Sequence, residues 1–241
     1  MFLSPLELLS ADEEARLFAL TEYDILHSLR EAAFNDFVQL AACVFRTPIS
    51  LIGLVDAELV HYEAAQGVPY LVNQPRQEAI CALLVRQNRA IVFTDLTQAS
   101  QYQQLTAAAY ANAQAQQFLF YAGVPLRPAN RHAVGTLCVI DRRPRQFNLP
   151  EMHVLEQLAK LVERLLIVRH TCLVSQWLGE DAWQNVQAYV SAKLRALNTV
   201  ACNAYRMRPV TPAVEPSLLW TIVNELNTLD AVLSEPLPGL A

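Results

Sequence analysis

The stretch that most restricts the fold of this chain is residues 120–145, FYAGVPLRPANRHAVGTLCVIDRRPR. Two apolar runs flank a polar segment, and an Asp-Arg-Arg-Pro-Arg sequence follows the second run. Apolar runs of strand length on either side of a turn are typical of a β-hairpin, and Pro144 ends the second strand. The chain is therefore expected to contain an antiparallel sheet.

The composition allows a large buried core. The chain has 241 residues, of which 53% are hydrophobic and 17% are charged. So few charges argue against disorder, and the length permits one large domain or a domain with an appendage. The net charge of −5 argues against a nucleic-acid-binding surface, which needs a basic face.

The sequence offers no targeting, membrane or metal signal. The first residues, MFLSPLELLSADEE, lack the basic region of a secretory signal, and no apolar run reaches the length of a membrane span. We therefore expect a cytoplasmic protein without membrane contact. The five cysteines and five histidines show neither disulfide nor metal-ligand spacing, so no disulfide framework, metal or cofactor is predicted. The cysteines are Cys43, Cys81, Cys138, Cys172 and Cys202.

The segments before the hairpin alternate between helix and strand patterns. Apolar residues recur at helical spacing up to Thr47-Pro48, whereas ISLIGLVD is apolar at nearly every position and is typical of a strand buried on both faces. Ala- and Gln-rich residues 98–117 favour one surface helix. The expected order is helices 13–26 and 34–45, strands 49–56 and 60–67, a loop at 68–79, helix 78–87, strand 90–96 and helix 98–117.

The segments after the hairpin are helical. A long helix is expected at about 149–168, a second from Asp181 to Met207 after a break at Gly179, and a last one capped by Ser217. A proline-rich linker falls near 209–216. The predicted fold class is α+β, with a domain at 1–168 (core about 11–168) and a helical C-terminal extension at 169–241.

The long helix has a second apolar face, which one sheet cannot cover. Pairing with a second chain about a twofold axis would bury this face, and we expect a homodimer built on it. The alternative is that the helix from Asp181 folds back over it. The residues of this seam are Val154, Leu158, Leu161, Leu165 and Val168.

Several motifs resemble one known family. Phe120-Tyr121-Ala122-Gly123 followed by Gly135-Thr136-Leu137-Cys138-Val139-Ile140-Asp141 is similar to the end of a bacterial GAF domain, of the subclass commonly fused to histidine kinases and diguanylate cyclases. Thr47-Pro48-Ile49 and Leu54-Val55-Asp56 follow the order of the same family. The resemblance implies a GAF/PAS-like antiparallel sheet with helices on both sides and a ligand pocket roofed by residues 68–117.

The sequence departs from the family mainly at its polar positions. Leu59-Val60-His61-Tyr62, Ala79-Ile80-Cys81-Ala82-Leu83 and Ala99-Ser100-Gln101-Tyr102 stand where relatives carry more polar or charged groups. A polar ligand would lose partners here, so an apolar or aromatic ligand is expected. The candidate pocket residues are Tyr62, Cys81, Tyr102, Phe120, Tyr121 and Cys138.

The resemblance also raises enzyme and chromoprotein alternatives. Covalent bilin attachment at Cys81 would normally need a following His, and Ala82 follows instead. A free methionine sulfoxide reductase would need Cys81 and Cys138 to attack and resolve, in a sequence context that is absent. Arg76 could meet an anion, although a surface or capping ion pair is the simpler interpretation.

The favoured function is therefore a sensory or regulatory module with no catalytic residue, which binds an unknown small ligand or a protein partner. A histidine kinase or cyclase is a possible signalling partner. The alternatives are a degenerate domain that serves only as a dimerisation scaffold, and an enzyme or chromoprotein of the two kinds above.

Overall fold

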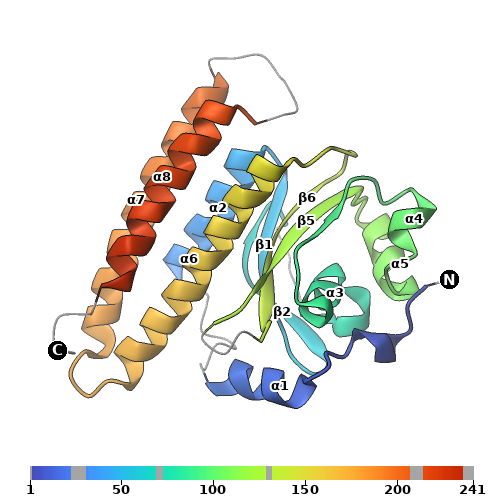
Figure 1. Cartoon of the computed structure of the whole chain (residues 1–241), viewed down its shortest axis with the longest axis horizontal. Coiled ribbons are helices and arrows are strands. Elements are labelled where there is room, and N and C mark those ends of the chain that lie inside the picture. Colours follow the sequence, from blue (N-terminus) through green and yellow to red (C-terminus); the bar gives the residue numbers. More distant parts are fainter. Residues whose placement is uncertain (1, 23–30, 69–72, 129–131, 207–213, 236–241) are drawn as a thin grey trace.

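The computed structural model describes residues 2–22, 31–68, 73–128, 132–206 and 214–235. An antiparallel six-stranded sheet lies at its centre, in the order β3-β2-β1-β6-β5-β4, with helices on both faces (Figure 1). The predicted α+β class is confirmed. The strands are β1 (Ile49–Val55), β2 (Leu59–Gln66), β3 (Gln74–Pro75), β4 (Ile91–Phe93), β5 (Phe120–Leu126) and β6 (Gly135–Asp141).

The hairpin predicted at residues 120–145 forms strands β5 and β6, which pair along their full length. All seven residues of β1 are buried, as its continuous apolar run predicted, because helices cover both faces of the sheet. β6 also pairs with β1, and the two backbones approach closely at Gly135. A side-chain carbon at Gly135 would lie 2.3 Å from the Gly53 carbonyl oxygen, so this position requires glycine.

Two long helices cover one face of the sheet, and short helices cover the other. The first pair is α2 (Ala32–Phe45) and α6 (Leu149–Val174); α6 begins with a capping box between Asn148 and Glu151. The opposite face carries α3 (Ile80–Gln87), α4 (Ala99–Tyr102) and α5 (Ala107–Ala115). Helix α1 (Glu13–Glu22) lies across one end of the sheet, and two short 3₁₀ turns are found at Pro5–Leu8 and Arg76–Glu78.

The single helix expected at 98–117 is in fact two. The chain leaves the helical path after Tyr102, and Thr106 caps α5 by accepting a hydrogen bond from the Ala109 amide at 3.0 Å. The Thr106 hydroxyl also donates to the Gln77 carbonyl, which ties α5 to the Arg76–Glu78 turn. A contact with a distant segment therefore decides where α5 begins.

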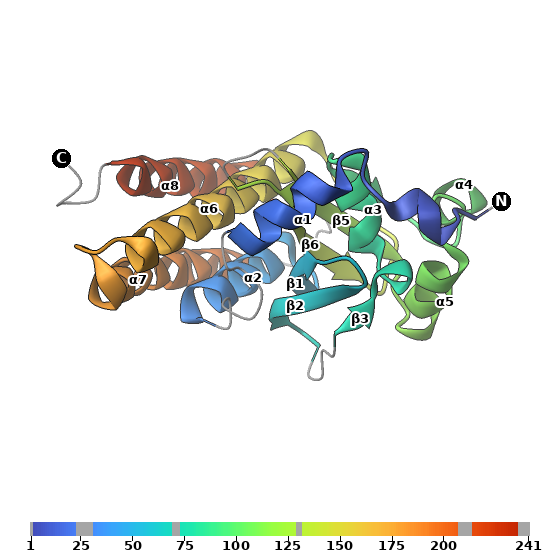
Figure 2. The ribbon, with the colours of Figure 1, turned by 90° about the horizontal axis from the view of Figure 1, so that it is seen from below.

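The C-terminal extension folds onto the same chain. Helices α7 (Gly179–Arg206) and α8 (Pro216–Ser234) pack on α2 and α6, on the side away from the sheet (Figures 1 and 2). Glu215 rather than Ser217 occupies the cap position of α8. The boundary expected at residue 168 falls inside α6, and most of the expected proline-rich linker lies outside the described residues.

This arrangement corrects the assignment of the α6 seam to a second chain. All five seam residues are buried within one chain, at 7% exposure or less, in a hydrophobic cluster that includes residues of α7 and α8. The fold-back alternative therefore describes the structure. The second apolar face of α6 is covered because the tail supplies two helices.

One further detail differs from expectation. Cys43 on α2 and Cys202 on α7 form a disulfide, with their Cα atoms 6.2 Å apart, although their spacing gave no sign of it. Cys81, Cys138 and Cys172 are free and buried, as expected. Of the three tail tryptophans only Trp183 is buried, whereas Trp177 and Trp220 are exposed. None of the helices in the described part of the chain has both the length and the apolar character that a membrane span requires.

Candidate functional site

A small cavity lies between the sheet and helices α3 and α5. Its volume is about 40 Å³, and Tyr62 of β2, Cys81 of α3, Tyr121 of β5 and Cys138 of β6 line it. Four of the six candidate pocket residues are thus brought together. Gln74, Glu78 and Asn112 also line it, and the remaining wall is apolar: Leu51, Ala79, Ile80, Ala109, Ala113, Phe118 and Ile140.

Strand alternation decides which residues of the hairpin reach this cavity. Tyr121 and Cys138 belong to the cluster under α3, whereas Phe120 belongs to the cluster under α2 and α6. There the Phe120 ring lies 5.7 Å from the Phe147 ring. The inclusion of Phe120 among the pocket candidates is therefore corrected.

Tyr102 does not line the cavity either. It lies at the end of α4, where its ring stacks on Tyr110 with the centroids 4.3 Å apart. Its position in the chain suggested the pocket roof, but the break between α4 and α5 places it elsewhere.

A larger cavity of about 300 Å³ adjoins the first and shares six lining residues with it, including Tyr62 and Gln74. Its polar lining groups are side-chain amides and one carboxylate, of which only Asn73 and Gln116 are absent from the inner cavity. None of these residues was predicted from the sequence. Asn112 and Gln116 are one helical turn apart, and this spacing could have predicted that both amides lie on one face of the helix. The polar lining residues are Asn73, Gln74, Glu78, Asn112 and Gln116.

Hydrogen bonds connect four of the residues that line both cavities. The Tyr62 hydroxyl donates to Gln74 Oε1 at 2.6 Å, and Gln74 Nε2 donates to the Glu78 carbonyl at 2.8 Å. Asn112 Nδ2 donates more weakly to the same carbonyl, at 3.4 Å. The Tyr62–Gln74 bond thus belongs to both linings.

One polar group in the inner cavity, the Tyr121 hydroxyl, has only a weak partner. The Tyr121 hydroxyl is buried beside the Cys138 thiol but makes no hydrogen bond of normal geometry among the described residues. A thiol is a weak hydrogen-bond acceptor, so the Tyr121 hydroxyl would gain from a stronger acceptor placed beside it.

Burial also sets the protonation of the two thiols. It raises the pKa of Cys81 to about 11 and raises that of Cys138 further. Both thiols therefore stay protonated near neutral pH. A thiol is a much weaker nucleophile than a thiolate, so this environment disfavours thiol catalysis.

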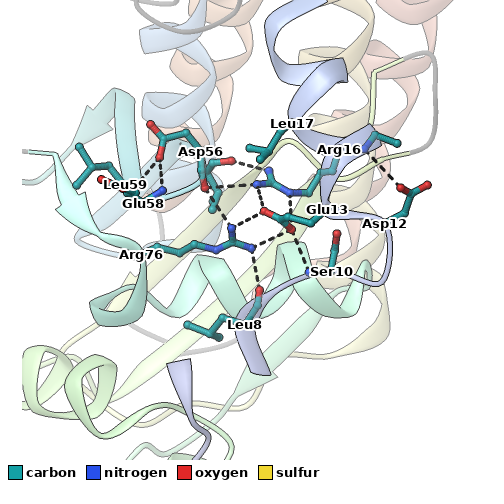
Figure 3. A network of polar contacts seen from close by, with 12 residues as sticks. Leu8, Ser10, Asp12, Glu13, Arg16, Leu17, Asp56, Glu58, Leu59 and Arg76 are labelled. Carbon is teal, nitrogen blue, oxygen red and sulfur yellow. Dashed lines mark hydrogen bonds and ion pairs between the residues drawn. The ribbon is translucent and has the colours of Figure 1, made fainter. Parts of the chain in front are cut away.

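The cavity linings hold no basic side chain among the described residues. Arg76, the candidate for an anion, is buried elsewhere. Its guanidinium forms an ion pair with Glu13 and donates to the Leu8 carbonyl at 2.8 Å (Figure 3). The ion-pair interpretation of Arg76 therefore describes the structure.

The sheet order and the helices on both faces define the class of this protein as an α+β domain built on an antiparallel sheet. The GAF domain family model matches residues 25–166, more than half of the chain, and the chain belongs to this family. The part of the match before residue 31 lies outside the described residues.

One relative is similar over almost the whole chain. It is the cyclic di-GMP phosphodiesterase PA2567 of Pseudomonas aeruginosa, 27% identical over 218 residues. The match covers 90% of this chain and 35% of the relative, so the chain spans about a third of the relative's length. The matched stretch is too long to end with the GAF model, and it extends into the helical tail.

Solved GAF domains are similar to this chain at low sequence identity and with TM-scores below 0.5. The GAF domain of the Acinetobacter phosphoenolpyruvate-protein phosphotransferase is 18% identical, with a TM-score of 0.47 over 70% of this chain and 98% of that one. The PixJ GAF domain of Thermosynechococcus elongatus is 20% identical, with a TM-score of 0.47 over 59% and 89% of the two chains. Similarity at this level supports no inference about ligand or activity.

Proposed function

We propose that this chain is a non-enzymatic regulatory GAF module that binds a small, uncharged and largely apolar ligand in the two adjoining cavities. The observation that carries the proposal is the chemistry of their linings. Apolar side chains make up most of the inner wall, together with two phenols and two protonated thiols. Gln74, Glu78 and Asn112 line both cavities, and Asn73 and Gln116 add further amides to the outer one. Such a site suits a ligand with an apolar group at one end and a neutral polar group at the other.

The same linings disfavour a phosphate-bearing ligand. Phosphate recognition generally uses Arg, Lys or the amides of a helix N-terminus. Here the charged group of the described lining is the Glu78 carboxylate, which repels anions. A cyclic nucleotide or dinucleotide would meet no compensating cation there.

The ligand's position follows from the cavity sizes. The outer cavity, at about 300 Å³, can hold the body of a small molecule, whereas the inner one, at about 40 Å³, can hold only a small group. Opening the Tyr62–Gln74 hydrogen bond would let that group enter deeper. An acceptor atom at the tip of that group would accept a hydrogen bond from the Tyr121 hydroxyl in place of the weak contact with the Cys138 thiol.

Output passes through the helical tail in this proposal. The match to the phosphodiesterase relative continues into the tail, which supports the view that the GAF domain and tail form one regulatory unit. The partner would be a signalling enzyme, and an enzyme of cyclic di-GMP turnover is favoured over a histidine kinase by that relative's name alone.

A thermal-shift screen of the full chain tests the ligand class. Neutral aromatic and aliphatic compounds should raise the melting temperature, because a ligand at a hundred times its dissociation constant stabilises by about 2.7 kcal/mol. Cyclic nucleotides and cyclic di-GMP should not. Stabilisation by the nucleotides alone would overturn the ligand class, and no stabilisation by any compound would favour the scaffold alternative.

Two tyrosine variants then locate the site. Tyr121→Phe should weaken binding of an acceptor-bearing hit about tenfold, the value of one net hydrogen bond of about 1.4 kcal/mol. It should leave an analogue without the acceptor unaffected. Tyr102→Phe is the matched control, since Tyr102 lies outside both cavities, and an equal loss in both variants would place the ligand elsewhere.

A further inference from the structure

The outward face of α8 carries a line of uncharged side chains. Successive members are three, four, three, four and three residues apart, which is the spacing of a helix-pairing seam. All of them are exposed. They are Ser217, Trp220, Asn224, Asn227, Ala231 and Ser234.

This face lacks the charges that usually cover an exposed helix. Within α8 the charged residues are Glu225 and Asp230. Asp230 forms ion pairs with Lys160 and Arg164 of α6, and Glu225 is exposed but lies off the line. Trp220, in contrast, lies on the line and is 69% exposed. A large aromatic ring gains free energy when a partner removes it from water.

When the line is reversed, the serines and asparagines keep their positions and only the tryptophan and the alanine change places. Its midpoint lies between Glu225 and Leu226. A second α8 running in the opposite direction about that midpoint would set the partner's Ala231 against Trp220 and the partner's Asn227 against Asn224. The large ring would meet a small methyl group, the two amides could hydrogen-bond, and serines would face each other at both ends.

We propose that two copies of this chain pair through antiparallel α8 helices, with this line as the seam. A second copy fits better than another protein because the complementary residues already lie on this helix. The twofold axis then forms each contact twice, once on each side of the axis. Buried asparagines also fix the register of a helix pair at some cost in stability. This seam is distinct from the α6 seam, which the tail itself covers.

The size of the seam sets the strength of the pairing. A helix of 19 residues is about 28 Å long, and one face of it supplies fewer than the 20–30 residues per side of a typical stable interface. The dimer should therefore exchange with monomer in the micromolar range.

Sedimentation velocity of the full chain tests the pairing. Between about 5 and about 300 µM the sedimentation coefficient should rise from the monomer value toward the dimer value. A chain that is still monomeric at the highest concentration would overturn the proposal.

Three variants identify the seam. Trp220→Ala should weaken the dimer at least tenfold, because the truncation occurs twice per dimer. Trp177→Ala removes an even more exposed tryptophan, 85% exposed, and should change nothing. The double variant Trp220→Ala with Ala231→Trp restores a large side chain opposite a small one and should regain most of the affinity. A dimer unaffected by Trp220→Ala would place the interface elsewhere.

Cysteine crosslinking decides the orientation. In the antiparallel arrangement Ser217 faces the partner's Ser234, whereas the two Ser217 residues lie about 25 Å apart. A mixture of Ser217→Cys and Ser234→Cys chains should therefore form a crosslinked heterodimer under mild oxidation, and Ser217→Cys alone should not. Efficient crosslinking of Ser217→Cys to itself would show a parallel pair and contradict the proposal.

Discussion

At the scale of single residues, the most connected polar group is Glu13. Its carboxylate accepts hydrogen bonds from the buried guanidinium groups of Arg16 and Arg76 and from the Ser10 amide (Figure 3). Arg16 also donates to the Val55 carbonyl at 2.5 Å, so the cluster ties α1 to the end of β1. Burial by itself would raise the pKa of Glu13, but these hydrogen bonds outweigh it and hold the pKa well below its usual range.

Glu13→Gln should lower the free energy of unfolding by about 3 kcal/mol at pH 7, because it leaves two buried guanidinium groups without their counter-charge. A carboxyl whose pKa is depressed by folding stabilises above its ordinary pKa of 4.5, and that stability is lost as the pH falls below it. The gap between wild type and variant should therefore shrink below pH 4.5.

Urea unfolding over a series of pH values measures this gap. Glu14→Gln is the matched control, since Glu14 is exposed on the same helix and should show little effect at any pH. A gap for Glu13→Gln that stays constant down to pH 3 would mean that the carboxylate charge does not matter.

At the scale of secondary structure, the contact between α2 and α7 holds the tail to the GAF domain. Arg195 of α7 forms an ion pair with Asp36 of α2 at 3.0 Å, and the Tyr205 hydroxyl donates to the Val44 carbonyl at 2.5 Å. The disulfide between Cys43 and Cys202 joins the same two helices across 159 residues of sequence. Closing so long a loop restricts the unfolded chain strongly.

Reduction of this disulfide should therefore lower the free energy of unfolding by about 4 kcal/mol. Thermal unfolding with and without dithiothreitol measures the effect. The double variant Cys43→Ser with Cys202→Ser should melt at the temperature of the reduced wild type and should not respond to the reductant. A wild type that melts alike in both conditions, with free thiols by mass, would show that the bond does not form.

At the scale of the whole molecule, the GAF domain and the tail share one hydrophobic core. The cluster between the sheet and α2 and α6 continues without a break into residues of α7 and α8, including Trp183 and Ile222. The tail is therefore part of the folded unit, and a ligand-dependent shift of α6 would change its packing against α7 and α8.

Removal of residues 175–241 should expose the apolar face of α6, including Leu161 and Leu165, and make the remaining chain poorly soluble. Removal of residues 214–241 alone, which deletes only α8, should have a smaller effect because α7 still covers α2. Soluble yield and thermal unfolding of both truncations provide the measurement. If the chain without residues 175–241 is as soluble and stable as the full chain, the tail is an independent appendage.

The sequence by itself determined the elements whose signals are local. The hairpin of β5 and β6, the doubly buried strand β1 and the long helix α6 follow from apolar periodicity and turn residues within single segments. The family resemblance supplied the cavity and gathered Tyr62, Cys81 and Cys138 around it.

Only the tertiary structure decided which distant segments meet. In the folded chain Tyr121 rather than Phe120 lines the cavity, and Cys43 pairs with Cys202. The amides of Asn112 and Gln116 line the same cavity as Tyr62, and the chain's own tail covers the α6 seam. Each outcome depends on the free energy of contacts between segments far apart in the chain. A periodic pattern records that a face must be buried, but it does not record what buries it.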